Sequence, residues 1–172
     1  KTQLVQIIMT TKISTADLYD EHGDSLQVCA PIFRDFGGLD SFTGPIKILK
    51  AFENFQMTRS TLETDGKGHV LVIDGGGSMR CAMLGDKLAQ LAIDNHWAGV
   101  VINGCIRDSA EIGKLPVGVK ALGTNPTRPS KEGGGQLDIA VRFGGVLFRP
   151  GDFLYADSDG IVLSETQLLT QA

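Results

Sequence analysis

The 172-residue sequence has no long hydrophobic run, no marked excess of one charge and few cysteines. No apolar stretch approaches the roughly 18 residues of a transmembrane helix, so we expect no membrane-spanning segment. The net charge of −4 gives no electrostatic reason to expect direct binding to nucleic acid. Hydrophobic residues make up 42% and charged residues 21% of the chain, which is typical of a soluble globular protein with a real core.

The cysteines and histidines form no catalytic or zinc-binding pattern. The three cysteines are an odd number without a CxxC motif, so we interpret them as small apolar side chains in a reducing compartment. No cysteine is placed beside a histidine in a way that suggests a nucleophile. The histidines are scattered, and we expect them in surface or capping roles. The residues concerned are Cys29, Cys81, Cys105, His22, His69 and His96.

Residues 1–12, KTQLVQIIMTTK, are expected to be an N-terminal extension or tail, and residues 13–172 a single domain. One leading lysine and a short apolar stretch make a poor signal peptide, so the cytoplasm is the expected location. Met9 could be the native start, in which case residues 1–8 are an addition to it.

Nucleotide-binding motifs are also missing, although Asp74 is followed by three glycines. A dinucleotide fingerprint that starts at Gly75 needs a glycine where this chain has Arg80. There is no GxxxxGK[ST] loop, and the spaced glycines of methyltransferases with a nucleoside cofactor are absent. Ser78 lacks the G-x-S-x-G frame of acyl transfer. We therefore favour a tight turn in which two of the three glycines adopt positive φ.

The segment from His69 to Asp108 has the clearest secondary-structure pattern. Apolar runs at 70–73 and 99–102 flank a segment with apolar residues at helical spacing, from Leu84 to Ala92. This pattern predicts strand, helix and strand, with the two strands parallel. Ligands of such units bind at the carboxyl ends of the strands, where residues 74–77 and 107–108 are expected.

Weaker patterns on both sides predict an α/β domain with a mixed sheet. Helices are expected after Ser14, at 54–65 and, as one or two turns, at 109–114. Strands or extended segments are expected at 28–33, 46–52, 117–122, 139–143, 146–148, 153–157 and 161–163. Residues 123–136 are rich in proline and glycine and predict a surface loop, and Asp159-Gly160 predicts a hairpin turn.

Asp86, Arg107 and Asp108 are the candidate functional side chains. Asp86 begins the predicted helix, where it could simply favour the helix dipole. The first-turn N–H groups from Gly85 to Leu88 would also suit an anionic oxygen. Arg107-Asp108 could be a surface ion pair that contributes little to stability. Alternatively, the guanidinium could clamp a substrate carboxylate while the acid binds Mg²⁺.

Several stretches resemble the regulator-of-ribonuclease-activity-A (RraA) family, which includes class II 4-hydroxy-4-methyl-2-oxoglutarate aldolases. They are FRDFGG, VLVIDGGGSMR, GDKLA, WAGVVINGCIRD and FGGVLFRPGDFLYADSDGIVLSE, and the resemblance runs from about Leu18 to Glu165. The enzymatic branch carries an Asp, twenty intervening residues and then Arg-Asp. Asp86, Arg107 and Asp108 match this spacing. Ribonuclease-regulating members can lack the second Asp, so its presence favours an enzyme.

The resemblance implies a swivelling β/β/α-type fold, a homotrimer with sites between subunits, and a divalent metal cofactor, with Mg²⁺ favoured. Asp108 would be the direct metal ligand and Asp86 would hold a metal-bound water. Arg107 would bind substrate, and the backbone of Gly85, Asp86, Lys87 and Leu88 would grip its carboxylate. Some aldolases add an acidic residue from a neighbouring subunit's C-terminal extension, which has no match here.

The function so implied is retro-aldol cleavage of 4-hydroxy-4-methyl-2-oxoglutarate to pyruvate, with oxaloacetate decarboxylation through the same pyruvate enolate. Mg²⁺ would act as a Lewis acid on the enolate, and Arg107 would add fixed positive charge. No Schiff-base lysine is needed, so the side chain of Lys87 has no assigned role. The alternative is a protein-binding regulator that docks on ribonuclease E and inhibits it, which an acidic surface would favour.

Overall fold

The computed structural model describes residues 12–129 and 134–168, so residues 1–8 and Met9 lie outside the described part. Its elements, in chain order, are α1 (Thr15–His22), a 3-10 turn (Gly23–Ser25), β1 (Gln27–Val28), β2 (Arg34–Asp35), β3 (Phe42–Lys50), α2 (Phe55–Leu62), β4 (Val70–Leu84), α3 (Asp86–Asp94), β5 (Gly99–Ile106), α4 (Ser109–Ile112), β6 (Gly118–Thr124), β7 (Gln136–Leu137), β8 (Val141–Phe143), β9 (Val146–Phe148), β10 (Phe153–Asp157) and β11 (Gly160–Ser164). Among them, no helix is long and apolar enough to cross a membrane.

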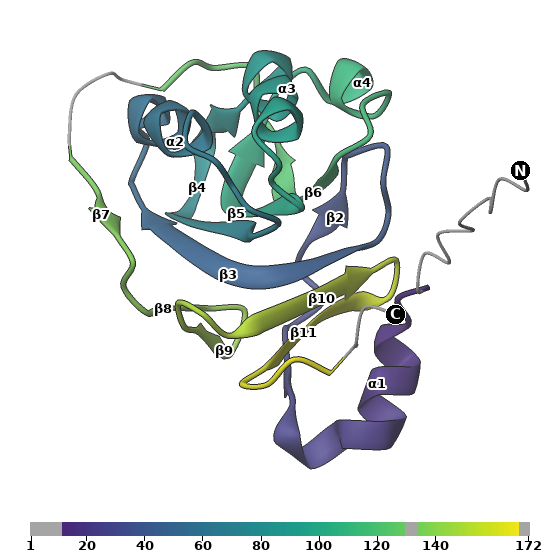
Figure 1. Ribbon diagram of the computed structural model, residues 1–172. Coiled ribbons are helices and arrows are strands. Elements are labelled where there is room, and N and C mark those ends of the chain that lie inside the picture. The colour runs from purple at the N-terminus through teal and green to yellow at the C-terminus, as the bar shows by residue number, and fades with distance from the viewer. Residues whose placement is uncertain (1–11, 130–133, 169–172) are drawn as a thin grey trace, which may run out of the picture.

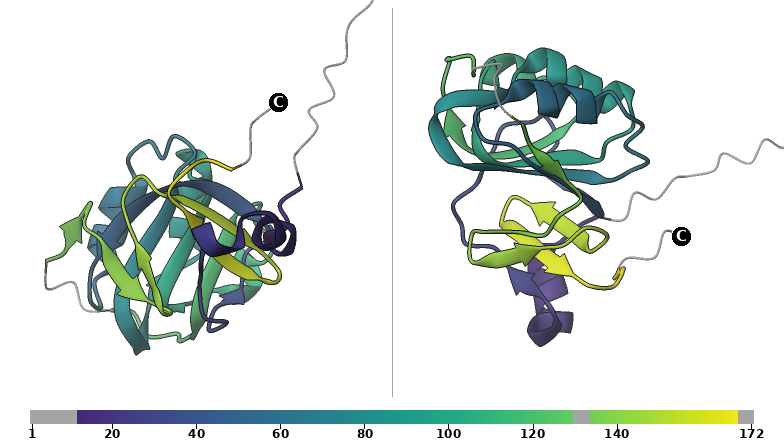
Figure 2. Two further views of the ribbon diagram at one scale, coloured as in Figure 1. Left: turned by 90° about the horizontal axis from the view of Figure 1, so that it is seen from below. Right: turned by 90° about the vertical axis from the view of Figure 1, so that its left-hand side faces the viewer.

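The fold has three layers (Figures 1 and 2). The helices α2, α3 and α4 cover one face of the parallel strands β3, β4, β5 and β6. The antiparallel strands β10 and β11 and the β8–β9 hairpin lie under the other face, and α1 lies beyond them. The β4–α3–β5 crossover is the predicted parallel unit, and the expectation of an α/β fold with a mixed sheet is confirmed.

Strand β4 shows how sequence alternation produces the two cores. Leu71 and Ile73 pack under the helices, whereas Val70 and Val72 pack against the β8–β11 layer. Successive side chains of a strand point to opposite faces, and a strand buried on both faces is apolar at every position. The continuous apolar run of β4 therefore reflects its central place in the sheet.

Strand β3 belongs to both layers. Its first half, Phe42–Pro45, pairs antiparallel with β10. Its second half, Ile46–Lys50, pairs parallel with β4. Strands β3 and β10 are far apart in the sequence, so their pairing leaves no local pattern in the residues around either strand. The sequence therefore did not predict this pairing.

Several boundary predictions were wrong: β3 begins at Phe42 and not at Ile46, and β8 begins at Val141 and not at Ile139. Two further differences involve turns that contain glycine. We expected a strand that ends at Ile73, but β4 continues through the glycines to Leu84, with shifts of register against β5. Gly76 and Gly77 have positive φ, as predicted for two of the three glycines, yet they kink a strand that continues. The hairpin turn also differs: Asp157 pairs with Gly160, so its two loop residues are 158 and 159.

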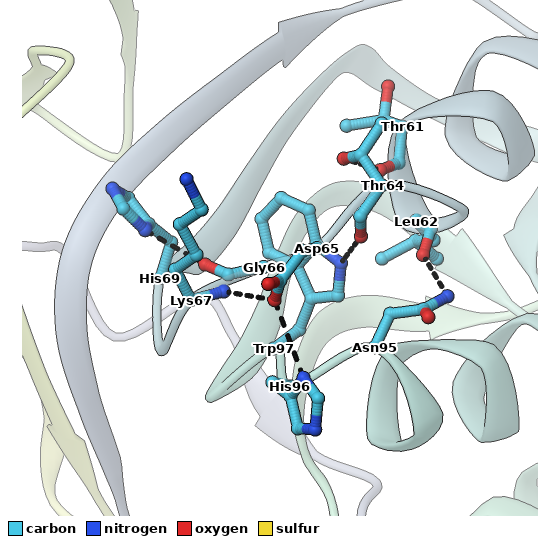
Figure 3. Close-up of polar contacts among 10 residues, drawn as sticks. All are labelled: Thr61, Leu62, Thr64, Asp65, Gly66, Lys67, His69, Asn95, His96 and Trp97. Atoms are coloured by element: carbon cyan, nitrogen blue, oxygen red, sulfur yellow. Dashed lines mark hydrogen bonds and ion pairs between the residues drawn. The ribbon is translucent and has the colours of Figure 1, made fainter.

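A cluster of polar contacts connects the segments that precede β4 and β5, at the amino ends of these parallel strands (Figure 3). Trp97 is buried, and its Nε1 donates to the Thr64 carbonyl at 3.2 Å. A Cβ on Gly66 would lie 2.5 Å from the Trp97 ring, so only glycine fits there. His69 Nδ1 lies 2.8 Å from the Gly66 carbonyl, and the exposed His96 pairs with Asp65. These histidines have the structural roles that the sequence predicted.

The cysteines are buried and form no disulfide in the described residues. Burial raises the pKa of the Cys29 thiol to about 11, and it also raises the pKa values of Cys81 and Cys105. A thiol with a raised pKa is a poor nucleophile near neutral pH. Their interpretation as apolar filling is confirmed.

A buried lysine connects three elements of the fold. Lys120 on β6 is 2% exposed, and its Nζ lies 3.1 Å from Asp35 Oδ1 on β2. The same Nζ donates to the Asp157 carbonyl on β10 at 2.7 Å. The Asp157 carboxylate in turn accepts hydrogen bonds from the N–H and the hydroxyl of Thr15 at the start of α1. The chain of contacts joins the parallel sheet, β10 and α1.

Asp157 predicts a dependence of stability on pH. Burial raises the pKa of its carboxyl, but hydrogen bonds from Thr15, Asp159 and Gly160 outweigh burial and lower the pKa overall. Because an unfolded Asp titrates near 3.9, the ionised carboxylate stabilises the fold above about pH 4. That stabilisation is lost as the pH falls through the folded-state pKa. Asp157→Asn should lower the free energy of unfolding at neutral pH and flatten its decline in acid, as measured by urea denaturation from about pH 3 to 7. An unchanged pH profile would contradict this.

Candidate active site

A cavity of about 240 Å³ opens at the carboxyl ends of β4 and β5. All six residues that the sequence singled out as a site line this cavity: Gly85, Asp86, Lys87, Leu88, Arg107 and Asp108. They come from the first turn of α3 and from the β5–α4 connection. The parallel pairing of β4 and β5 brings the two segments together, and the N–H of Arg107 donates to the Leu84 carbonyl at 2.9 Å.

The two acids are linked through the start of α3. The backbone N–H of Asp86 donates to Asp108 Oδ2 at 3.1 Å, and the N–H of Lys87 donates to Asp86 Oδ1 at 2.8 Å. The predicted anion-binding N–H groups are therefore in place, and two of the four are bound by the chain's own carboxylates. Negative charge at a helix N-terminus is favourable, so the helix holds both acids at the cavity.

Asp108 has a left-handed backbone conformation, with φ 57° and ψ 38°. This conformation costs a non-glycine residue about 1 kcal/mol, and Asp is one of the residues that tolerate it best. The turn directs the Asp108 carboxylate back to the N–H of Asp86 and begins α4, because the Asp108 carbonyl accepts from Ile112. Backbone strain at an acid that faces a cavity is typical of functional residues.

Gly85 leaves the space that the Asp108 carboxylate occupies. A Cβ at Gly85 would lie 2.7 Å from Asp108 Oδ2, whereas its φ of −122° is open to any residue. Gly85→Ala should therefore displace the Asp108 carboxylate without backbone strain. If the cavity is an active site, the kcat/KM of its reaction should fall about tenfold to a hundredfold, with a melting temperature near that of the wild type. Gly104→Ala is the matched control, since a Cβ there meets only ordinary contacts of 3.5 Å or more. Full activity in Gly85→Ala would show that this space is not needed.

The donor set fits a hard divalent cation. Asp86 and Asp108 share the cavity, and residues 12–129 and 134–168 contain no group of three or more His, Cys, Asp or Glu side chains that could hold a metal ion. Mg²⁺ binds through one or two carboxylates and keeps several waters, whereas zinc prefers three or four nitrogen or sulfur ligands. The residues present therefore match Mg²⁺ better than a zinc site.

Phe55, Arg59 and Arg128 are among the residues of the cavity wall that the sequence did not predict. Phe55 and Arg59 come from α2, and Arg128 comes from the segment after β6. The Arg128 guanidinium carbon lies 4.6 Å from the centre of the Phe55 ring. Arg128 stands in the proline- and glycine-rich stretch that we interpreted only as a surface loop. A basic residue shortly after a parallel strand was the available signal.

The glycine-rich cluster at Asp74 lies apart from this cavity. Asp74 Oδ1 accepts from the N–H of Gly76 and from Asn103 Nδ2, both at 3.0 Å. Asp74 lines another cavity, together with Lys50 and Phe52. The expectation that both polar clusters lie at the carboxyl ends of the strands holds for Arg107-Asp108, which follow β5, but is wrong for residues 74–77, which lie within β4.

The fold and the cavity define an α/β protein with a small basic pocket that contains two metal-compatible acids. The chain belongs to the RraA-like family, Aldolase/RraA, whose model matches residues 15–163. A relative from Aromatoleum aromaticum is 52% identical over 158 residues, which cover 92% of this chain and 99% of the relative. That protein is named as a 4-hydroxy-4-methyl-2-oxoglutarate aldolase, and its name marks the assignment as provisional.

Two solved structures share the fold. One, from Geobacillus kaustophilus, is described as an S-adenosylmethionine:2-dimethylmenaquinone methyltransferase; it is 51% identical, with a TM-score of 0.88 over 91% of this chain and 97% of that one. The other is described as the RNA-processing inhibitor RraA from Thermus thermophilis; it is 38% identical, with a TM-score of 0.87 over 94% of this chain and 99% of that one. These descriptions name three activities, so the argument for function rests on the site.

Proposed function

We propose that the protein is a lyase of 2-oxo acids that depends on a divalent metal, with Mg²⁺ favoured. It would cleave 4-hydroxy-4-methyl-2-oxoglutarate to pyruvate and decarboxylate oxaloacetate. The observation that carries the proposal is the meeting of Asp86, Arg107 and Asp108 in one cavity. The name of the relative that is 52% identical supports the same substrate.

Cleavage breaks the bond between C3 and C4 of the substrate and leaves its electron pair on pyruvate as an enolate. Asp108, with Asp86 beside it, would hold the metal, which when bound supplies Lewis-acid stabilisation of the enolate. Arg107 would bind the C1 carboxylate with its guanidinium fork and place fixed positive charge beside the enolate oxygen. The N–H groups at the start of α3, Gly85 to Leu88, would orient the same carboxylate, and those of Asp86 and Lys87 would first have to exchange their present partners, Asp108 and Asp86.

Protons must also move. The C4 hydroxyl loses a proton as the bond breaks, and C3 gains one to form pyruvate. No histidine lines the cavity, so we assign Asp86 to orient the water that accepts the hydroxyl proton. Decarboxylation of oxaloacetate needs no hydroxyl proton to leave, because CO₂ departs and its electron pair forms the same enolate. One site can therefore perform both reactions.

The test is turnover by the purified wild-type protein with Mg²⁺ or with EDTA. Pyruvate released from 4-hydroxy-4-methyl-2-oxoglutarate and from oxaloacetate is followed by a coupled reduction, and the decay caused by free metal is subtracted. Saturable turnover that EDTA removes is expected for both substrates. Rates no higher than the metal blank would reject the lyase proposal.

A second candidate is a protein-binding regulator that docks on ribonuclease E, and the description of the Thermus relative favours it. The Asp108 carboxylate separates the two roles, because a metal lyase needs it and a regulator does not. Ribonuclease E captured equally by wild type and Asp108→Ala would support regulation as a separate function. We do not propose methyl transfer, because the glycines after Asp74 kink β4 and do not form a loop at a helix N-terminus.

We also infer, from the family resemblance, that the active form is a homotrimer with its sites between subunits. This quaternary structure would complete a cavity that is open in one chain. Light scattering of the purified protein measures it directly.

A further inference from the structure

We propose that Arg128, assisted by Arg59, forms a second carboxylate-binding subsite in the cavity. It would bind the carboxylate on the part of the substrate that leaves, and so select dicarboxylic 2-oxo acids. The inference rests on the proposed lyase activity and adds a specificity determinant to it. Neither arginine belongs to the Asp-Arg-Asp constellation that suggested the function.

The charges of the cavity wall are the first observation. Four basic side chains line it (Arg59, Lys87, Arg107 and Arg128), against two acids (Asp86 and Asp108). The wall therefore carries an excess of two positive charges, in a chain whose net charge is −4. A single substrate carboxylate on Arg107 would leave basic groups of the wall without a counter-charge. A second carboxylate would complement them.

The position of the two arginines is the second observation. Arg59 lies on α2 and Arg128 follows β6, whereas Arg107 precedes α4. Helix α3 packs against both α2 and α4 and lies between them in Figure 1. The three arginines thus reach the cavity from three separate segments, and Arg128 lies on the α2 side because it contacts Phe55. A substrate bound at Arg107 would direct its other end toward that side.

Arg128 is held in place by an aromatic ring. Its guanidinium carbon lies 4.6 Å from the centre of the Phe55 ring, within the range of a cation–π interaction. Phe55 is the first residue of α2, and the Asn54 side chain caps that helix by accepting from the N–H of Gln56 at 3.0 Å. A guanidinium stacked on a ring keeps its edge free to bind a carboxylate with two parallel hydrogen bonds.

Arg59 is the weaker partner. It lies one helical turn after Phe55, and therefore on the same face of α2. Its Nε contacts Glu63 Oε1 at 3.5 Å, which offsets part of its charge. Glu63 does not line the cavity that holds Asp108, but it lines a neighbouring cavity together with Arg59 and Arg128. Arg128 is therefore the principal residue of the subsite.

The two reactions make opposite demands on this subsite. In aldol cleavage the distal carboxylate stays charged in the product, so Arg128 binds it throughout. In oxaloacetate decarboxylation the distal carboxylate is the group that leaves as neutral CO₂, with its electron pair on the enolate. An arginine that binds this carboxylate stabilises the substrate more than the transition state, and so does not accelerate the step.

The experiment compares Arg128→Met with the wild type in both reactions. Cleavage of 4-hydroxy-4-methyl-2-oxoglutarate should lose about tenfold to a hundredfold in kcat/KM, the value of a charge-assisted hydrogen bond. The kcat of oxaloacetate decarboxylation should be unchanged or raised. The kcat/KM for cleavage of 4-hydroxy-2-oxopentanoate, which lacks the distal carboxylate, should be the same in the variant and in the wild type. Equal losses on all three substrates would overturn the subsite.

Three variants serve as comparisons. Arg128→Lys keeps the charge and should recover part of the aldol activity. Arg59→Met should lower the kcat/KM of aldol cleavage less than Arg128→Met does, because Glu63 already offsets part of the charge of Arg59. Arg149→Met removes a guanidinium that pairs with Glu165 away from the cavity, and should change neither reaction.

Binding without turnover separates this inference from the proposed function. 2-Oxoglutarate has both carboxylates but no C4 hydroxyl, and 2-oxopentanoate lacks the distal carboxylate. In calorimetry with Mg²⁺ the wild type should bind 2-oxoglutarate about tenfold or more tightly than 2-oxopentanoate, and Arg128→Met should lose this difference. No preference in the wild type overturns the subsite even if the protein is a lyase. A preference in a protein without turnover rejects the lyase and leaves the subsite standing.

Discussion

Asp108→Asn should reduce oxaloacetate decarboxylation and aldol cleavage about a thousandfold after correction for the metal blank. The substitution keeps the shape of the side chain but removes the charge that a hard cation requires. The amide oxygen can still accept the N–H of Asp86, as Asp108 Oδ2 does at 3.1 Å, so the local fold is retained. The measurement is the rate sensitive to EDTA, together with the melting temperature.

Asp94→Asn is the control for this variant. Asp94 is the last residue of α3 and accepts a hydrogen bond from Gln90 Nε2 at 2.9 Å, away from the cavity. Its substitution removes an acid from the same helix and should leave the rate within about twofold of the wild type. If Asp108→Asn kept more than a tenth of the wild-type rate, Asp108 would not be the metal ligand.

Lys120→Met should lower the free energy of unfolding by about 2–4 kcal/mol. The buried ammonium contacts the Asp35 carboxylate at 3.1 Å and the Asp157 carbonyl at 2.7 Å. Methionine fills a similar volume but leaves both oxygens without this partner, and an oxygen that loses its partner costs more than the contact itself contributed. In a protein of this size the loss corresponds to a fall in melting temperature of about 5–15 °C.

Urea denaturation at neutral pH measures the effect. Lys114→Met is the matched control, because Lys114 is exposed and pairs with the neighbouring, exposed Glu111, at 3.4 Å. It should change stability by no more than about 0.5 kcal/mol. The double variant with Lys120→Met and Asp35→Asn should lose less free energy of unfolding than the sum of the losses in the two single variants, since the two side chains interact. A loss below about 1 kcal/mol in Lys120→Met would mean that the contacts of the buried ammonium contribute little.

Local patterns in the sequence were enough to predict the centre of the fold. The apolar runs at Val70 and Gly99 and the periodic segment between them predicted β4, α3 and β5, and with them the edge of the sheet that holds the cavity. The carboxyl ends of parallel strands meet at one edge, so Arg107-Asp108 could be predicted at a ligand-binding edge, but residues 74–77 were predicted beside them and lie within β4 instead. The chemical roles of these residues came from the family resemblance.

Other features depend on contacts between distant segments. Nothing near Ile73 shows that β4 continues to Leu84, because the kinked part of the strand is held by register shifts against β5. Arg128 was hidden by its surroundings, since prolines and glycines are typical of a surface loop whether or not the loop borders a site. Arg59 lies on an exposed helix face, where a basic residue carries no signal of its own. Only the packing of α2 and the segment after β6 around the cavity assigns them to it.

The division of β3 bears on how such a protein can diverge in evolution. The cavity depends on the half of β3 that pairs with β4, whereas β10, β11 and α1 depend on the half that pairs with β10. Mutations on the solvent-facing side of the lower layer, away from the core that it shares with Val70 and Val72, can therefore accumulate without moving Asp86, Arg107 or Asp108. One descendant could keep the chemistry while its lower surface acquires a new protein partner. Another could lose a single acid at the cavity and keep the whole scaffold for binding alone.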